Sequence, residues 1–135
     1  MKIDDVLDAM NISYINESVY GHFSFDIELL DYGFLIEIMG DYWHTSPLIY
    51  KDYSKLNKTQ LKDVRIDCAK RAFILKYEGK HVLNLWESDI NNNLNLCKSL
   101  IKYFIDNNGV LQNYESFNYD NDLNINNTLT HPHFD

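Results

Sequence analysis

The segment Phe34-Leu35-Ile36-Glu37-Ile38-Met39 constrains the fold more than any other stretch of this chain. Its side chains are apolar except for Glu37, and Gly33 and Gly40 enclose it, so it predicts a largely buried strand. A packed core has no need for a carboxylate, because burying one without a partner is costly. Glu37 therefore predicts that a polar site lies beside this strand.

The remaining elements predict a small α/β domain. The order α-β-β-α-β-α indicates helices flanking a small mixed β-sheet. We expect residues 1–108 to form this domain and the Asn- and Asp-rich residues 109–135 to be an extended tail. We expect a helix over 3–10, followed by a strand over 23–27 that forms an antiparallel hairpin with a strand over 34–39. A helix over about 56–77 should then stop at Gly79 and be followed by a strand over 81–86. Ser88 can cap a last helix, which is interrupted or delayed at Asn91-Asn92-Asn93 and continues to Ile105.

Charge is distributed unevenly along the chain. The formal net charge is -8 at pH 7, which at first sight argues against a nucleic-acid partner. However, residues 51–80 hold nine of the twelve Lys and Arg residues and only four acidic residues. This segment is either a solvated, lysine-rich helix face or a surface that follows a phosphate backbone, with Lys58, Lys62 and Arg65 as DNA contacts.

Other features of the composition bear on location. No stretch approaches the roughly 20 apolar residues that a membrane-spanning helix needs, and the N-terminus has no signal-peptide pattern. Cys68 and Cys97 lack metal-ligand spacing, and disulfide scaffolds need more cysteines. We therefore expect reduced cysteines, a cytoplasmic location and no membrane partner.

Two acids and a histidine form a candidate catalytic group. A hairpin can bring Asp26 close to Glu37, and paired carboxylates bind hard divalent cations such as Mg²⁺ or Mn²⁺. His44, in the loop after the second strand, could deprotonate an attacking water, and Asp67 on the basic helix could orient the imidazole. Such a group would suit in-line hydrolysis of a phosphodiester.

Each member of this group also has a simpler interpretation. Asp26 could be a surface residue of a half-exposed strand, and His44 an ordinary loop histidine. Asp67 could pair with Lys70 or Arg71 on its own helix. Tyr42 and Trp43 could fill the core. The combination, rather than any single residue, points to a site.

The same residues, taken in order over about residues 23–90, resemble the very-short-patch-repair endonucleases. They are still more similar to the related phage and intron-associated homing endonucleases (EDxHD type) of the PD-(D/E)xK restriction-endonuclease-like superfamily. The matching features are Asp26, the block Gly40-Asp41-Tyr42-Trp43-His44, the pair Asp67-x-x-Lys70, and the segment Gly79-Lys80-His81-Val82-Leu83-Asn84-Leu85-Trp86-Glu87.

The resemblance implies a restriction-endonuclease-like core with roles for particular residues. Asp26 would be the central magnesium ligand, with Glu37 beside it and the backbone carbonyl of Ile38 also offered to the metal. His44 would act on the nucleophilic water, and Asp67 would hydrogen-bond to His44.

The resemblance also assigns the aromatic residues and reveals differences. Tyr42 and Trp43 would wedge into the DNA base stack. Met39 stands where the superfamily usually has the lysine of Glu-x-Lys. The acidic residue that the family supplies from an N-terminal helix has only Asp4 or Asp5 as a loose substitute.

We therefore expect a magnesium-dependent endonuclease that acts on double-stranded DNA and comes from a mobile or phage-like genetic element. One alternative is a DNA repair nickase of the same fold. Others are an inactive nuclease-fold module that binds DNA or protein, and an acidic protein that mimics DNA. Target specificity would be low, or would come from the tail or from a second subunit in a homodimer.

Overall fold

A four-stranded mixed sheet organises the chain. The computed structural model describes residues 2–40 and 55–109. The sheet has the order β1-β2-β3-β4; β1, β2 and β3 are antiparallel neighbours, and β4 runs parallel to β3. The elements in chain order are α1 (Lys2–Ala9), β1 (Tyr14–Tyr20), β2 (Phe23–Leu29), β3 (Phe34–Met39), α2 (Lys58–Glu78), β4 (Val82–Trp86), α3 (Glu87–Asn92) and α4 (Leu94–Asp106).

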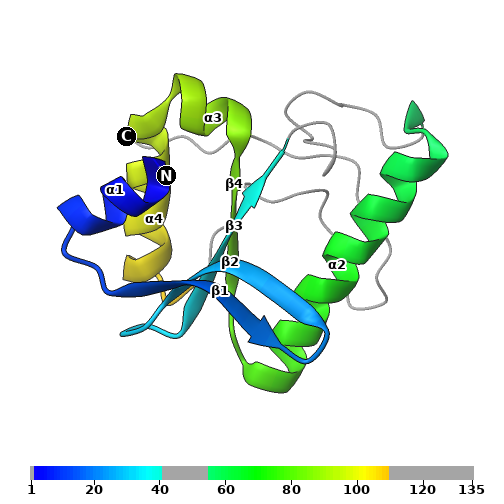
Figure 1. Cartoon of the computed structure of the whole chain (residues 1–135), viewed down its shortest axis with the longest axis horizontal. Coiled ribbons are helices and arrows are strands. Elements are labelled where there is room, and N and C mark those ends of the chain that lie inside the picture. Colours follow the sequence, from blue (N-terminus) through cyan, green and yellow to red (C-terminus); the bar gives the residue numbers. More distant parts are fainter. Residues whose placement is uncertain (1, 41–54, 110–135) are drawn as a thin grey trace.

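The helices lie on two sides of this sheet (Figure 1). One hydrophobic cluster joins the sheet to α1, α3 and α4, through residues that include Leu7, Ile36 and Phe104. A smaller cluster of Phe25, Leu35, Ile74 and Val82 joins the sheet to α2. The expected α/β fold with a small mixed sheet flanked by helices is therefore confirmed.

Strand β1 is absent from the sequence prediction. Its residues show no clear apolar alternation, because β1 pairs only with β2 and leaves most of its side chains exposed, Ile15 and Val19 among them. An edge strand of this kind is held by backbone hydrogen bonds rather than by a buried face. The hydrophobic pattern of the sequence therefore gives little indication of strand β1.

The ends of α2 agree with local chemistry. Asn57 accepts a hydrogen bond from the Gln60 amide, and the Gln60 side chain accepts one from the Asn57 amide, which forms a capping box. Gly79 ends the helix at φ 63°, as expected from its position.

The last helical segment differs in detail from the prediction. Ser88 lies inside α3, which begins at Glu87, so the expected Ser88 cap is wrong. The interruption near Asn91-Asn92-Asn93 is confirmed, because α3 ends at Asn92 and the Asn93 side chain accepts a hydrogen bond from the Leu96 amide at the start of α4. Within residues 2–40 and 55–109, no helix has the length and apolar character needed to cross a membrane.

Candidate active site

Asp26 on β2 and Glu37 on β3 exchange hydrogen bonds across the hairpin. The Asp26 amide donates to Glu37 Oε1 at 2.8 Å, and the Ile38 amide donates to Asp26 Oδ2 at 2.8 Å. The backbone pairing of the two strands runs from Leu29↔Phe34 to Ile27↔Ile36 and stops there. Beyond that point the two carboxylates, rather than backbone carbonyls, accept hydrogen bonds from the amides of the facing strand. These bonds hold the two side chains next to each other.

The neighbouring strand is also interrupted at this level. The pairing of β1 with β2 passes from Asn16↔Ile27 to Ser18↔Phe25 and omits Glu17 and Asp26. Glu17 adopts a φ of 57°, a left-handed conformation that costs free energy for a residue with a side chain. Irregular backbone of this kind often accompanies functional sites. Here it lies opposite Asp26.

Helix α2 supplies a cation to Glu37. Lys70 Nζ lies 2.8 Å from Glu37 Oε2, and the two side chains are 18% and 12% exposed. The Lys70 ammonium also lies 4.5 Å from the centre of the Phe25 ring. Each Glu37 oxygen thus accepts a hydrogen bond from the protein, one from the Asp26 amide and one from Lys70.

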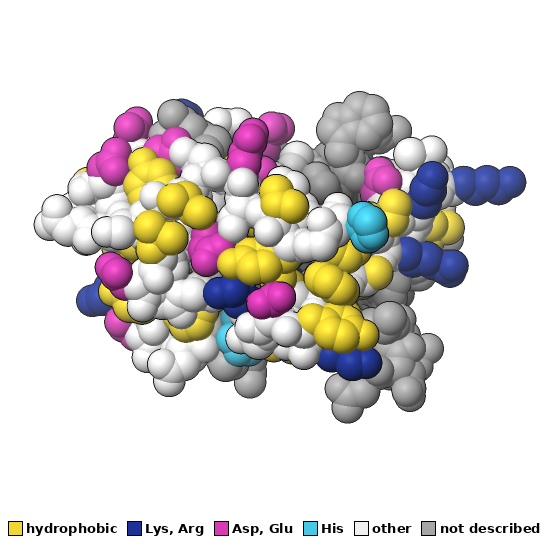
Figure 2. Space-filling view, turned by 60° about the horizontal axis from the view of Figure 1, so that its bottom comes forward, with side chains coloured by type: hydrophobic (Ala, Val, Ile, Leu, Met, Phe, Trp, Pro, Cys, Tyr) yellow, Lys and Arg dark blue, Asp and Glu magenta, His cyan; other side chains and the backbone are white. Residues whose placement is uncertain are grey.

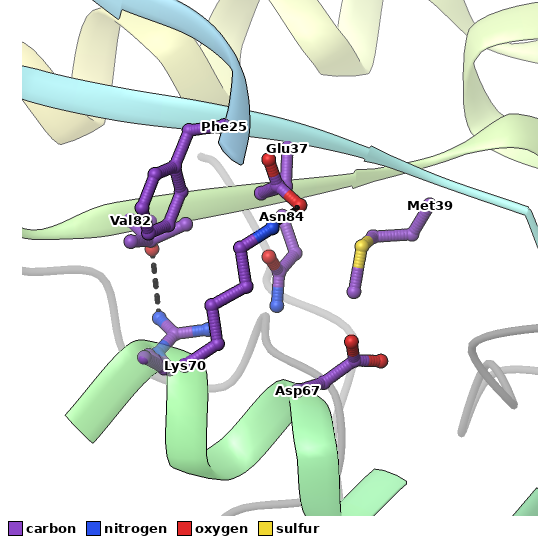
Figure 3. Close-up of a pocket in the computed structure, with 8 residues that line it drawn as sticks. Phe25, Glu37, Met39, Asp67, Lys70, Val82 and Asn84 are labelled. Carbon is purple, nitrogen blue, oxygen red and sulfur yellow. Dashed lines mark hydrogen bonds and ion pairs between the residues drawn. The ribbon is translucent and has the colours of Figure 1, made fainter. Parts of the chain in front are cut away.

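A narrow cavity separates the sheet from α2 at this point (Figure 3). Its lining includes Glu37 and Met39 from β3, Asp67 and Lys70 from α2, and Asn84 from β4. Asn84 is the register partner of Glu37 across the parallel β3–β4 pair, so both side chains point towards α2. The cavity volume open to the centre of a water-sized sphere is about 10 Å³.

The electrostatics of Glu37 reflect its burial. Burial has the largest effect and raises the pKa of the Glu37 carboxyl above its ordinary value. The Lys70 ammonium opposes this increase through its hydrogen bond and charge, while the nearby Asp26 carboxylate adds to it. Among the described residues, the Lys70 ammonium and the Asp26 amide therefore favour the charged form of Glu37.

The fold brings together four of the predicted site residues. Asp26 and Glu37 contact each other's strands, Asp67 lines the cavity beside Glu37, and the Ile38 backbone lies against Asp26. His44, Tyr42 and Trp43 lie outside the described residues, so the proposed His44–Asp67 contact stays a prediction. Within the described ranges, no three Asp, Glu, His or Cys side chains gather as a metal-binding group.

The predicted DNA contacts lie on α2. Lys58, Lys62 and Arg65 are exposed in the N-terminal half of that helix. Figure 2 shows Lys and Arg side chains gathered at the end of the molecule where α2 lies, while most acidic side chains in that view lie towards the other end. The segregation of charge expected from the sequence is therefore present on the surface.

Sequence reasoning missed two residues of this cavity as site members, Lys70 and Asn84. Lys70 follows Asp67 by three positions and so shares its helix face. Asn84 is the one polar residue in the apolar run Val82–Trp86, which is the same signal that singled out Glu37 in its strand. Spacing therefore marks both residues, but only the fold shows that they lie beside Glu37.

Comparison with known structures agrees with this architecture. The chain is similar to the solved "Homing Endonuclease I-Bth0305I Catalytic Domain", with a TM-score of 0.54 and 22% sequence identity, over 79% of this chain and 92% of that one. The chain has a nuclease-like fold. At this identity the likeness establishes the shared fold alone. No protein-family model matches the chain, and no curated protein matches it.

Proposed function

We propose that this nuclease-like domain is a metal-dependent endonuclease of the homing or mobile-element type, which hydrolyses phosphodiester bonds in duplex DNA. The observation that carries the proposal is the pair of carboxylates, Asp26 and Glu37, held side by side at the end of the β2–β3 ladder. The similarity to a homing endonuclease catalytic domain supports it. The EDxHD pattern of Asp26, His44 and Asp67 belongs to the same proposal.

The residues present fit a magnesium or manganese ion. Mg²⁺ usually binds proteins through one or two carboxylates, together with water and substrate phosphate oxygens, so a two-carboxylate set is sufficient. Asp26 and Glu37 would hold the ion, with the Ile38 carbonyl as a further oxygen ligand. When bound, such an ion polarises the phosphoryl group and lowers the pKa of water.

The chain's own residues would divide the remaining work. The Ile38 amide orients the Asp26 carboxylate, and Lys70 balances the charge of Glu37. His44 would take the proton of the attacking water, and Asp67 would orient its imidazole.

Contacts outside this centre would hold the DNA. Tyr42 and Trp43 would wedge into the base stack, as apolar side chains do in other DNA-bending proteins. Lys58, Lys62 and Arg65 would contact phosphates along the exposed side of α2.

A plasmid assay tests this function. Purified protein should nick or linearise supercoiled DNA in the presence of Mg²⁺ or Mn²⁺, and chelation should stop the reaction. Asp26→Asn and His44→Ala should each abolish cleavage, whereas Asp31→Asn at an exposed turn position should not. Accumulation of nicked circles without linear product would favour the repair-type nickase. Cleavage that survives both substitutions would show that the site is assigned wrongly.

One observation favours a second candidate, an inactive nuclease-fold module that binds DNA or protein. Lys70 Nζ lies 2.8 Å from Glu37 Oε2, an oxygen that a metal ion would need as a ligand. A module of this kind would retard DNA in a mobility-shift assay with or without metal, and would cut none of it. A homodimer, measured by light scattering, fits either candidate.

A further inference from the structure

Lys70 pairs with a carboxylate that the proposed metal ion needs. Its Nζ lies 2.8 Å from Glu37 Oε2, and the Lys70 and Glu37 side chains are 18% and 12% exposed. Figure 3 shows Lys70 reaching from α2 towards Glu37 on β3. Because the pair is largely shielded from water, the ammonium attracts Glu37 strongly and would repel a second cation at the same oxygen. A metal ion therefore competes with Lys70 for Glu37.

The contacts of Lys70 allow its ammonium to move. It lies 4.5 Å from the centre of the Phe25 ring, a contact with no fixed hydrogen-bond direction. Lysine carries its charge on a flexible four-carbon chain, so the ammonium can turn to a new anion while α2 stays in place. Arg71 also lines the cavity, but its Nη2 donates to the Val82 carbonyl at 2.8 Å, which ties the guanidinium to β4. Lys70 is therefore the cation of the two whose pairing a metal ion at Glu37 would disrupt.

The charges of the described residues at this site favour a further anion once a metal ion is bound. In their ionised forms, three carboxylates face two cations; the carboxylates are Asp26, Glu37 and Asp67, and the cations are Lys70 and Arg71. A divalent cation turns this excess of one negative charge into an excess of one positive charge. A DNA phosphate supplies the balancing negative charge. As a ligand of the ion it would lie next to Glu37, where the Lys70 ammonium can reach it.

We infer that Lys70 is an exchangeable counterion, which pairs with Glu37 in the free protein and moves to the scissile phosphate when a divalent cation binds Glu37. This inference rests on the proposed function. Lys70 then has two opposed effects: it weakens metal binding to the DNA-free protein, and it stabilises the negative charge that develops on the phosphate during cleavage. The Glu37–Lys70 ion pair is thus the resting state of an active site rather than a permanent block.

The variant Lys70→Met tests the first effect without DNA. Removing the ammonium should tighten the binding of Mn²⁺ to the DNA-free protein by about tenfold, since the competing cation is lost. Electron paramagnetic resonance of free Mn²⁺ at pH 7 measures the affinity, on protein whose fold is checked by circular dichroism. Lys70→Gln, which is uncharged but can still donate to Glu37, should shift the affinity in the same direction and serves if the methionine variant does not fold.

The matched control is Lys76→Met, which removes an exposed lysine from the same helix and should leave the Mn²⁺ affinity unchanged. A lysine that only supports the structure predicts the opposite shift, because Glu37 would be displaced and Mn²⁺ would bind Lys70→Met more weakly. Folded Lys70 variants that bind Mn²⁺ no more tightly than wild type would therefore overturn the inference.

Plasmid cleavage at saturating Mn²⁺ tests the second effect. Lys70→Met should lower kcat on the order of 10²-fold, as loss of one group that stabilises transition-state charge commonly does. A lysine that only blocks the metal would instead give an unchanged or higher kcat, and that result would overturn the move to the phosphate.

The two readouts together separate this inference from the proposed function. If the wild-type protein cleaves DNA but the Lys70 variants bind Mn²⁺ no more tightly, the function stands and the inference is wrong. If the variants bind Mn²⁺ more tightly but the wild-type protein cleaves no DNA, the proposed function fails and the competition for Glu37 stands.

Discussion

At the scale of single residues, the ion pair of Glu37 and Lys70 joins the candidate site to stability. The folded protein raises the pKa of Glu37, and an acid of this kind favours folding most below its unfolded pKa and least above its folded pKa. As the pH rises, the Lys70 ammonium stabilises the ionised Glu37 carboxylate and so limits this loss of folding stability. Removing Lys70 should therefore destabilise the protein most in alkaline solution.

Lys70→Met should show this pH dependence. We expect a loss in the free energy of unfolding of about 1–3 kcal/mol at pH 8, because a buried carboxylate is left without its cation, and a smaller loss at pH 5. Urea denaturation at both pH values measures the difference. Lys62→Met removes an exposed lysine of the same helix and should have little effect at either pH. Equal losses for Lys70→Met at both pH values would contradict the assignment.

The pKa of Glu28 is shifted in the opposite direction to that of Glu37, below its ordinary value. Its carboxylate accepts hydrogen bonds from Ser18 Oγ at 2.6 Å and from the Tyr20 hydroxyl at 2.5 Å, and Lys80 Nζ lies 3.7 Å away. Burial alone would raise the pKa of Glu28, but the Ser18 and Tyr20 hydrogen bonds and the Lys80 charge lower it below the ordinary value of 4.5. Its contribution to stability is therefore present above pH 4.5 and is lost as the pH falls through the lowered pKa.

Glu28→Gln should reduce the free energy of unfolding by about 1 kcal/mol at pH 7, because a charged acceptor is replaced by a neutral one. The difference from wild type should disappear in acid. Thermal unfolding between pH 3 and pH 7 would follow it, with the exposed Glu17→Gln as the control. A difference that persists at pH 3 would show that packing, rather than charge, explains the effect.

At the scale of elements, the end of α2 depends on backbone conformation alone. Gly79 has a φ of 63°, and a Cβ placed there would meet no atom of residues 2–40 or 55–109 within 4 Å. Substitution therefore tests the left-handed conformation without a steric clash.

Gly79→Ala should cost about 1 kcal/mol in the free energy of unfolding, since alanine disfavours a left-handed conformation. Gly79→Asn should cost less, because asparagine tolerates this region. Chemical denaturation of the two variants measures the difference. If both variants lost the same stability, strain at φ would not be the cause.

The buried face of α2 differs from what its apolar residues suggest. Leu75 and Ala69 are exposed, whereas Gln60, Val64, Cys68 and Ile74 are buried. Their order along the helix gives little amphipathic signal, because the face that meets the sheet also carries Asp67, Lys70 and Arg71. A helix that holds polar groups against a site cannot also show a clean apolar stripe.

At the scale of the whole molecule, the charge distribution matters more than the total. The chain carries a formal net charge of -8, yet α2 exposes Lys58 and Lys62 in its N-terminal half. Such a local patch can bind DNA although the net charge opposes it.

The double variant Lys58→Gln/Lys62→Gln should weaken DNA binding and reduce the salt dependence of log Kd by about 0.9 for each lost phosphate contact. Lys98→Gln/Lys102→Gln removes two exposed lysines from α4 and serves as the matched control. Fluorescence anisotropy over a range of salt concentrations measures both variants. If the control lost as much affinity, DNA binding would not be localised to α2.

The sequence by itself determined features that depend on local chemistry. The strand of Glu37, the stop at Gly79 and the break before α4 follow from apolar runs, a left-handed glycine and side-chain caps, which act over a few residues. Asp26 and Glu37 could be paired in advance because a hairpin leaves few alternatives. The role of His44 is still a prediction, because it lies outside the described residues.

Only the tertiary structure decided which elements meet. Placing β4 parallel to β3 sets Asn84 beside Glu37, and packing α2 across that face brings Lys70 to the same carboxylate. Periodicity reports that a side chain is buried but not which distant side chain it faces, because that depends on strand order and helix orientation. Glu37 was visible as a polar residue in a buried strand, whereas its cation and its neighbouring amide emerged only from the fold.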